Sequence, residues 1–175
     1  MGWFNMPATV QESAFERQIK EGKAYQLTEE FSIPAGATIW LYIQLPADKD
    51  VVLESRSLQA TSGPVRYKVY PNAILTGTLG VQYVPEKLNT KKNGPALTQM
   101  NRVTAADINI TGISPSDKKL VVAGQDSGSR GTGSQVFQSY FKVYAAGTKI
   151  AVSIQNSSSI TSFVELQYLW AEDVE

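Results

Sequence analysis

Residues 31–44 read FSIPAGATIWLYIQ, and this stretch shows the pattern on which the fold depends. Ile39, Leu41 and Ile43 occupy alternate positions after the turn at residues 34–36. An apolar side chain at every second residue is typical of a β-strand, because successive side chains point to opposite faces. A second alternating run precedes the Pro-Ala-Gly turn. The stretch therefore predicts two strands joined by a tight turn.

The same alternation recurs along most of the chain, with turn residues about every ten positions. Besides 39–45, the expected strands are 25–33, 51–58, 65–70, 73–84, 107–111, 119–123, 136–145, 149–155 and 162–170. A long polar connection is expected at 85–103. Many short strands without long helices between them are typical of an antiparallel sandwich. The predicted fold class is all-β, an antiparallel jelly-roll-like β-sandwich with one short N-terminal helix.

One segment near the other end of the chain is similar to 31–44. Residues 141–155, FKVYAAGTKIAVSIQ, also combine an aromatic residue, an Ala-Gly turn and an Ile-x-aliphatic-x-Ile-Gln ending. Two such hairpins would occupy equivalent places in a two-sheet jelly roll. Alternating strands around Ala-Gly turns also look alike by chance, and the sequence leaves both explanations open.

The N-terminal segment 1–22 is expected to be a separate unit that precedes a β-sandwich domain, 23–175. A short helix is expected over about 10–21, with Thr9 and Glu12 as a capping box and Gly22 at its C-terminal end. The preceding arm, 1–8, is apolar, whereas chain ends are usually polar. We therefore expect docking on another surface through the large apolar residues Trp3, Phe4, Met6 and Phe15.

The composition disfavours several classes of function. The chain has 16 Lys and Arg residues and 16 Asp and Glu residues, so its formal charge of zero favours neither nucleic acid nor an anionic membrane as a partner. His and Cys are both absent, which removes the commonest general base, the commonest metal ligand and the thiolate nucleophile. No catalytic residue, metal site or cofactor is predicted. The N-terminus has no signal-peptide pattern, and no apolar run is long enough to span a membrane.

The segment 124–135, GQDSGSRGTGSQ, resembles active-site loops at first sight. Its Asp-Ser-Gly sequence is similar to the nucleophile segment of trypsin-like proteases, but a serine nucleophile needs a nearby base, and the chain contains no His. The lysine of a phosphate-binding loop is also missing. We interpret the segment as a loop between strands, with Arg130 as its one strong hydrogen-bond donor for a partner.

Other polar motifs are weaker candidates. Glu54 and Glu165 are isolated acids on predicted strands, and hydrolysis by such a carboxylate pair is a third, less favoured hypothesis. Glu29 and Glu30 are adjacent on one strand, so they are expected to point to opposite faces. The glycosylation-type motifs at Asn109 and Asn156 are expected to be coincidental because no signal peptide precedes them.

The aromatic residues indicate a covered or binding surface. Trp40 and Tyr42 lie on the opposite face of their strand from Ile39 and Leu41, so this strand is apolar on both sides. An ordinary sandwich strand exposes one face to water. The N-terminal helix is the first candidate to cover this face, and the arm, a neighbouring subunit and a stacked sugar ring are the others. The candidate residues for an interaction or sugar-stacking face are Trp40, Tyr42, Tyr67 and Tyr70.

Two stretches carry a family resemblance. Residues 14–58, AFERQIKEGKAYQLTEEFSIPAGATIWLYIQLPADKDVVLESRSL, and 89–102, NTKKNGPALTQMNR, resemble small virion structural proteins of tailed bacteriophages. Those are β-sandwich proteins that decorate or complete the head or tail. The resemblance implies a non-enzymatic role in the virion, assembled in the host cytoplasm, with binding to other virion proteins and to copies of itself, a trimer among the options. The alternative is a carbohydrate-binding module or receptor-binding head domain with a glycan as partner.

Overall fold

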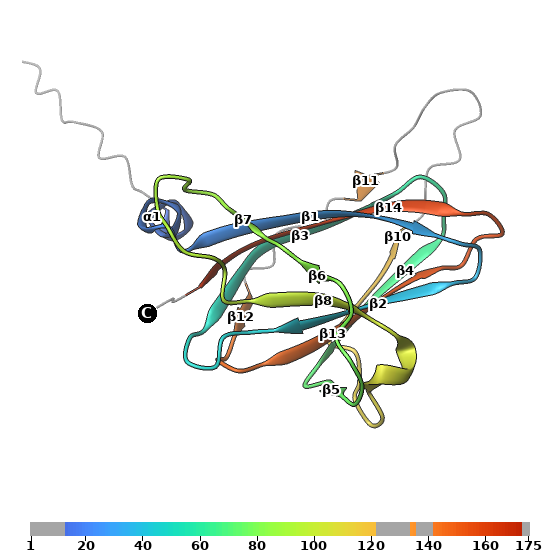
Figure 1. The fold of residues 1–175 in the computed structure, drawn as a ribbon. Coiled ribbons are helices and arrows are strands. Elements are labelled where there is room, and N and C mark those ends of the chain that lie inside the picture. Colours follow the sequence, from blue (N-terminus) through green and yellow to red (C-terminus); the bar gives the residue numbers. More distant parts are fainter. Residues whose placement is uncertain (1–12, 122–133, 136–141, 173–175) are drawn as a thin grey trace, which may run out of the picture.

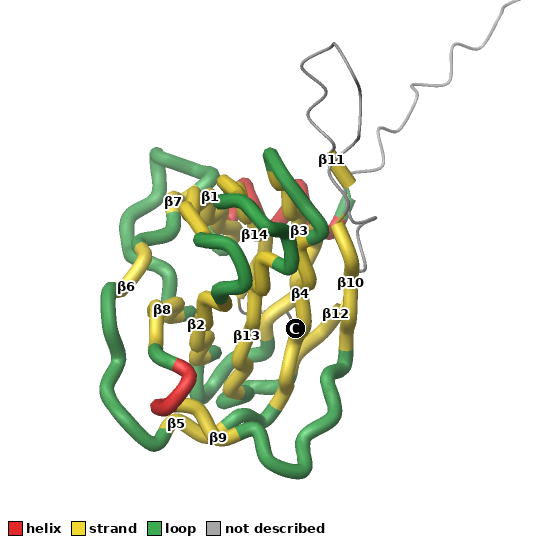
Figure 2. Tube along the Cα trace, turned by 90° about the vertical axis from the view of Figure 1, so that its right-hand side faces the viewer, coloured by secondary structure: helices red, strands yellow, loops and turns green. Residues whose placement is uncertain are grey.

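The computed structural model describes residues 13–121, 134–135 and 142–172, and these residues form an all-β sandwich with one short helix (Figure 1). Two antiparallel sheets pack face to face, and most of the long strands were predicted from the alternating pattern. Sheet A has the order β11-β3-β14-β1-β7, with β12 also pairing with β3, and sheet B has the order β10-β4-β13-β2-β8-β6 (Figure 2).

The bounds of the strands are as follows. Sheet A contains β1 (Ala24–Ile33), β3 (Val51–Ala60), β7 (Glu86–Lys87), β11 (Ser134–Gln135), β12 (Lys142–Tyr144) and β14 (Ser162–Glu172). Sheet B contains β2 (Thr38–Gln44), β4 (Val65–Pro71), β6 (Gln82–Tyr83), β8 (Gln99–Val103), β10 (Asp117–Val121) and β13 (Lys149–Asn156). Outside both sheets, β5 (Ile74–Leu75) pairs with β9 (Ile108–Asn109) just after a 3-10 turn, η1 (Ala105–Asp107).

The main core lies between the two sheets and is built from the predicted alternating residues. On β14, the inward side chains Val164, Leu166, Tyr168 and Trp170 are all buried, as expected from their spacing. Leu41, Val65 and Leu58 from three other strands are completely buried beside them. Each such aliphatic side chain contributes about 1.5–3 kcal/mol by leaving water. This burial on facing sheets, rather than any single bond, stabilises the sandwich.

The two similar segments are arches between sheets rather than hairpins within one sheet, which corrects the prediction. In 31–44 the chain passes from β1 in sheet A to β2 in sheet B, and in 141–155 it passes from β12 in sheet A to β13 in sheet B. Gly36 and Gly147 adopt φ values of 71° and 72° at corresponding places in the two turns. At both places the turn needs a left-handed conformation, which glycine adopts without strain.

The two arches are related by the pairing of β2 with β13. Leu41 lies opposite Val152, while Ile39 and Ile43 lie opposite Ile154 and Ile150. This antiparallel register is symmetric about the Leu41–Val152 pair, so the repeated sequence pattern corresponds to repeated structure. The sequence left open whether the two segments are equivalent, and the register favours equivalence.

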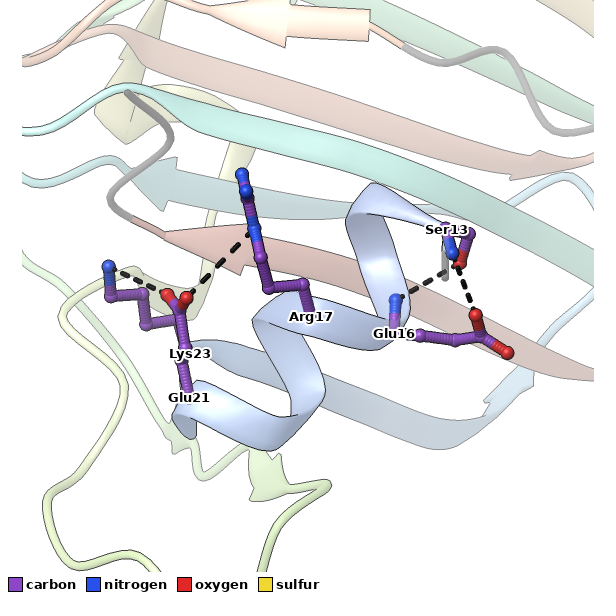
Figure 3. Close-up of polar contacts among 5 residues, drawn as sticks. All are labelled: Ser13, Glu16, Arg17, Glu21 and Lys23. Carbon is purple, nitrogen blue, oxygen red and sulfur yellow. Dashed lines mark hydrogen bonds and ion pairs between the residues drawn. The ribbon is translucent and has the colours of Figure 1, made fainter. Parts of the chain in front are cut away.

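The N-terminal helix α1 (Ala14–Glu21) is shorter than predicted and has a different cap (Figure 3). The Ser13 hydroxyl accepts a hydrogen bond from the Glu16 amide at 3.2 Å, and the Ser13 amide donates to the Glu16 carboxylate at 2.8 Å. These bonds also lower the pKa of Glu16. The predicted cap Thr9 lies outside the described residues. Gly22 ends the helix with a φ of 76°, as predicted.

Two expectations about residues 73–103 were wrong. Residues 73–84 do not form one strand, because Gly77 and Gly80 interrupt the run and only β5 and β6 are regular. A Cβ atom at Gly80 would lie 2.5 Å from the Arg102 carbonyl oxygen, so the chain passes too close there for a larger residue. The connection predicted at 85–103 instead contains β8, which pairs with β2. The polar residues of QMNRV hid this strand, which lies between β2 and β6.

Candidate interaction surfaces

Trp40 and Tyr42 lie on the outer face of sheet B, and other segments of the same chain cover them. Tyr42 is completely buried, and its hydroxyl donates to the Ala73 carbonyl oxygen at 3.3 Å. The Trp40 and Tyr70 rings pack with their centroids 5.8 Å apart. The cover comes from residues on the two excursions at 71–75 and 103–113, including Ala73, Leu75, Ile108, Ile110 and Ile113, and it also packs on Val103 of β8. Figure 1 shows β5, which belongs to this cover, below sheet B.

This arrangement corrects the first-ranked prediction that the N-terminal helix covers the Trp40 face. The helix instead packs against β1 and β14 in sheet A. The two excursions supply the cover because sheet B otherwise has an apolar outer surface, and burying it in the same chain costs no association entropy. A second hydrophobic core therefore lies outside the sandwich, and it is formed partly by segments whose sequences lack the alternating pattern of a strand.

Tyr67 does not share a face with the other three aromatic residues of the predicted surface. Its side chain is completely buried between the sheets, and its hydroxyl lies 2.6 Å from that of Tyr168. The Arg56 guanidinium lies 5.3 Å from the centroid of the Tyr67 ring and forms an ion pair with Asp117. The four residues come from β3, β4, β10 and β14, so this polar cluster joins both sheets.

The electrostatics of this cluster follow from burial. Removal from water raises the pKa of Tyr67, an effect that the Arg56 charge partly offsets. Burial also raises the pKa of Tyr168 well above its usual value, and the neighbouring Tyr67 raises it further. Both phenols therefore remain neutral, because an ionised phenol would lose its hydration in the interior. The cluster lies beside a cavity of about 40 Å³ in the main core.

The acidic residues are arranged differently from the hydrolase hypothesis. The register places Glu165 opposite Glu30 on one side and Gln59 on the other, away from Glu54. Glu30 is exposed, whereas Glu29 is half-buried and burial raises its pKa, so the two acids do point to opposite faces as predicted. Among residues 13–121, 134–135 and 142–172, no group of three or more Asp or Glu side chains is placed to hold a metal ion.

Asn156 is a structural residue in the folded chain. It is completely buried, and its amide nitrogen donates to the carbonyl oxygens of Ile33, Pro34 and Ile160 at 2.9, 3.2 and 2.7 Å. The glycosylation-type motif there therefore presents no accessible nitrogen. Asn109, in contrast, is exposed, and its side-chain oxygen accepts a bond from the Thr111 amide.

An apolar surface that the sequence pattern did not reveal lies at one edge of sheet B. We call residues 74–84 the edge segment, which includes β6, the outermost strand of the sheet. Val81 is 66% exposed and Val84 80%, one on each side of β6, and no residue between 74 and 84 carries a charge. Ile74 is 58% exposed in β5, outside the sheet. Edge strands are usually protected by charges or by cover. The signals available in the sequence were Gly77 and Gly80, which mark where the regular strand fails.

The remaining predicted contact residues are only partly described. Phe15 is half-buried on α1. The arm residues Trp3, Phe4 and Met6 and the loop residue Arg130 lie outside the described residues. Within the described part of the chain, α1 and η1 are both far too short to cross a membrane.

Comparison with known proteins identifies no matching protein-family model, no similar curated protein and no similar solved structure.

Proposed function

We propose that this chain is a non-enzymatic structural protein of a tailed-bacteriophage virion that associates with copies of itself and with other virion proteins. The observation that carries the proposal is the uncharged edge segment, in which Val81 and Val84, one on each side of β6, are exposed in a single copy. Exposed apolar side chains on an unprotected sheet edge favour association with another chain. The resemblance of residues 14–58 to phage virion proteins indicates the setting.

The strand succession supports the same proposal. Strands β1 to β4 alternate between the sheets, giving β1-β14-β3-β12 in sheet A and β2-β13-β4-β10 in sheet B. We infer a jelly roll from this order, since two interleaved Greek keys produce such an alternation. Jelly rolls occur in viral capsid proteins and in lectins, so the architecture is compatible with a virion role without assigning it.

The test is the solution mass of the full chain, measured by light scattering over a range of concentrations. We expect an oligomer that dissociates in a Val81→Asp, Val84→Asp double variant, because two buried carboxylates would lose their hydration at the contact. Deletion of residues 1–8 tests the separate contribution of the arm. Virions assembled without the protein should bind the full chain in a co-sedimentation assay. A chain that stays monomeric and does not bind such particles would refute the proposal.

A second candidate function, glycan binding, is supported by one exposed aromatic residue. A ring must be accessible to stack on a sugar, and Tyr42 and Tyr67 are buried whereas Phe163 is 61% exposed. Phe163 borders a surface hollow of about 310 Å³ that is also lined by Glu30, Gln59 and Thr61. A glycan screen with the full chain and with Phe163→Ala tests this function. Binding that Phe163→Ala abolishes, with unchanged oligomeric mass, would support it.

A further inference from the structure

The two outer faces of the sandwich carry opposite charges. On sheet A, we define the acidic face by Glu30, Glu86 and Glu165, which point outward because their neighbours in each strand point inward. On sheet B, we define the basic face by Arg66, Lys68 and Lys118, which alternate with inward-facing Val65, Tyr67 and Lys119. The formal charge of zero for the whole chain conceals this separation.

Within each face, like charges lie directly opposite each other. Glu30 pairs with Glu165 across β1 and β14, and Lys68 pairs with Lys118 across β4 and β10. Like charges in such cross-strand positions repel each other and destabilise a sheet. Within the described ranges, no ion pair relieves any of these four charges. Outward positions on β1, β3 and β14 hold no Lys or Arg. Outward positions on β4, β10 and β13 hold no Asp or Glu.

Each face also carries one exposed apolar side chain beside its charges. Phe163, 61% exposed, borders the hollow on the acidic face that contains Glu30 and Glu165. Leu120, 49% exposed, lies opposite Arg66 on the basic face. A hollow with two carboxylates and a phenyl rim matches a pair of lysines beside a leucine in both charge and polarity. Interfaces commonly combine such an apolar contact with charged groups around it.

We infer that the acidic face of one copy binds the basic face of a second copy. The contact is head to tail, because it joins two different surfaces, and it leaves each copy with a further face for the next one. It relieves both repelling pairs at once, since Glu30 and Glu165 then face Lys68 and Lys118. This inference rests on the proposed self-association and adds the surfaces and orientation that the edge segment does not define.

A charge-exchange experiment on the full chain tests the contact. In the acidic-face variant, Glu30→Lys and Glu165→Lys, both faces are basic; in the basic-face variant, Lys68→Glu and Lys118→Glu, both faces are acidic. Each variant keeps a like-charged cross-strand pair, so the internal electrostatics of the sheets are matched to the original chain. We expect each variant alone to associate at least about tenfold more weakly than the original, because facing like charges repel. An equimolar mixture should recover the original affinity as an assembly containing both variants.

Two control variants carry the same changes in net charge away from both faces: Glu21→Lys with Asp48→Lys, and Lys91→Glu with Lys92→Glu. All of these residues are exposed, and we expect both controls to associate like the original chain. Sedimentation velocity at low and high salt provides the second readout, and association through the faces should weaken as salt screens the charges.

The outcomes separate this inference from the proposed function. One outcome is that the Val81→Asp, Val84→Asp variant no longer associates, while salt and charge exchange leave the association of the original chain unchanged. That outcome would overturn the contact between the faces but would leave the proposed self-association standing. The face contact would also be overturned if the original chain and the equimolar mixture of the two charge-exchange variants both remained monomeric at millimolar concentration. Binding to virus particles tests the virion role independently. If Glu30→Lys with Glu165→Lys abolishes glycan binding without changing the mass, the face binds sugar instead.

Discussion

Asn156 offers the sharpest test of the packing described above. It links the arch between β1 and β2 to the β13–β14 turn through three donated hydrogen bonds, at 2.7 to 3.2 Å, to backbone carbonyl oxygens. Its own oxygen accepts bonds from the Ser158 amide and hydroxyl. Replacement by Asp preserves the size and shape of the side chain. It also replaces the donating nitrogen by an oxygen, so the Ile33 carbonyl loses this donor, whereas the Pro34 carbonyl keeps the Ala37 amide and the Ile160 carbonyl keeps the Ser158 hydroxyl.

The expected loss follows from the number of bonds. An amide group has two N–H donors, so the three short contacts represent about two full hydrogen bonds. The Ile33 carbonyl loses this donor, and the new buried carboxylate faces carbonyl oxygens to which it cannot donate. Each unsatisfied buried group costs about 1–3 kcal/mol, so Asn156→Asp should reduce the free energy of unfolding by about 2–6 kcal/mol. Domains of this size have total stabilities of about 5–15 kcal/mol, so the variant should be strongly destabilised.

Urea unfolding, followed by tryptophan fluorescence, measures this loss. Asn109→Asp is the matched control, because Asn109 is exposed and its side chain accepts a bond that a carboxylate also accepts. The control should change the stability by less than about 0.5 kcal/mol. If Asn156→Asp lost less than about 1 kcal/mol, or no more than the control, the amide would not be the fixed link between the β1–β2 arch and the β13–β14 turn that the contacts indicate.

Three further predictions address the core, the helix and the edge. Burial raises the pKa of Tyr67 and Tyr168, so the folded chain keeps two protons that the unfolded chain releases above about pH 10. The free energy of unfolding should therefore be constant below that pH with respect to these groups. Above that pH it should fall by up to about 1.4 kcal/mol per pH unit for each phenol. Urea unfolding at about pH 8 and pH 11 measures this slope, and a Tyr67→Phe, Tyr168→Phe variant that keeps the full slope would contradict the assignment. Ser13→Ala removes the helix cap and should cost about 1 kcal/mol in the same assay, with faster amide exchange in α1. Gly80→Ala should loosen the edge segment, since the added methyl group meets the Arg102 carbonyl oxygen, and faster amide exchange in β6 and β8 would show it.

The long strands were predictable because burial on one face imposes a period of two that is visible in the residues. Residues 162–170 are an example, since every second side chain faces the core. The alternation shows which face of a strand is buried but not which sheet contains the strand. The turn at Gly36 was therefore expected in a hairpin, whereas it forms an arch between sheets. The strand with which a given strand pairs depends on contacts between residues far apart in the sequence, and the local alternation of residues carries no information about these contacts.

The candidate surfaces were less predictable for a related reason. Trp40 and Tyr42 were recognised as needing cover, but the cover comes from the segments at 71–75 and 103–113, which have little regular structure of their own. Their burial depends on the position of sheet B and not on a period in their sequence. Tyr67 was grouped with Tyr70 by residue type, although the alternation along β4 separates Tyr67 from Tyr70 by placing them on opposite faces.

Charge shows most clearly how composition and structure differ in what they reveal. A net charge of zero argues against a strongly charged partner when charges are spread evenly over the surface. Here the register brings Glu30 next to Glu165, and Lys68 next to Lys118, from positions far apart in the chain. Opposite faces of one neutral molecule then have opposite signs, and such a molecule is complementary to its own copies. The absence of net charge argues against a strongly charged partner, but it is also the condition under which copies can stack without accumulating charge.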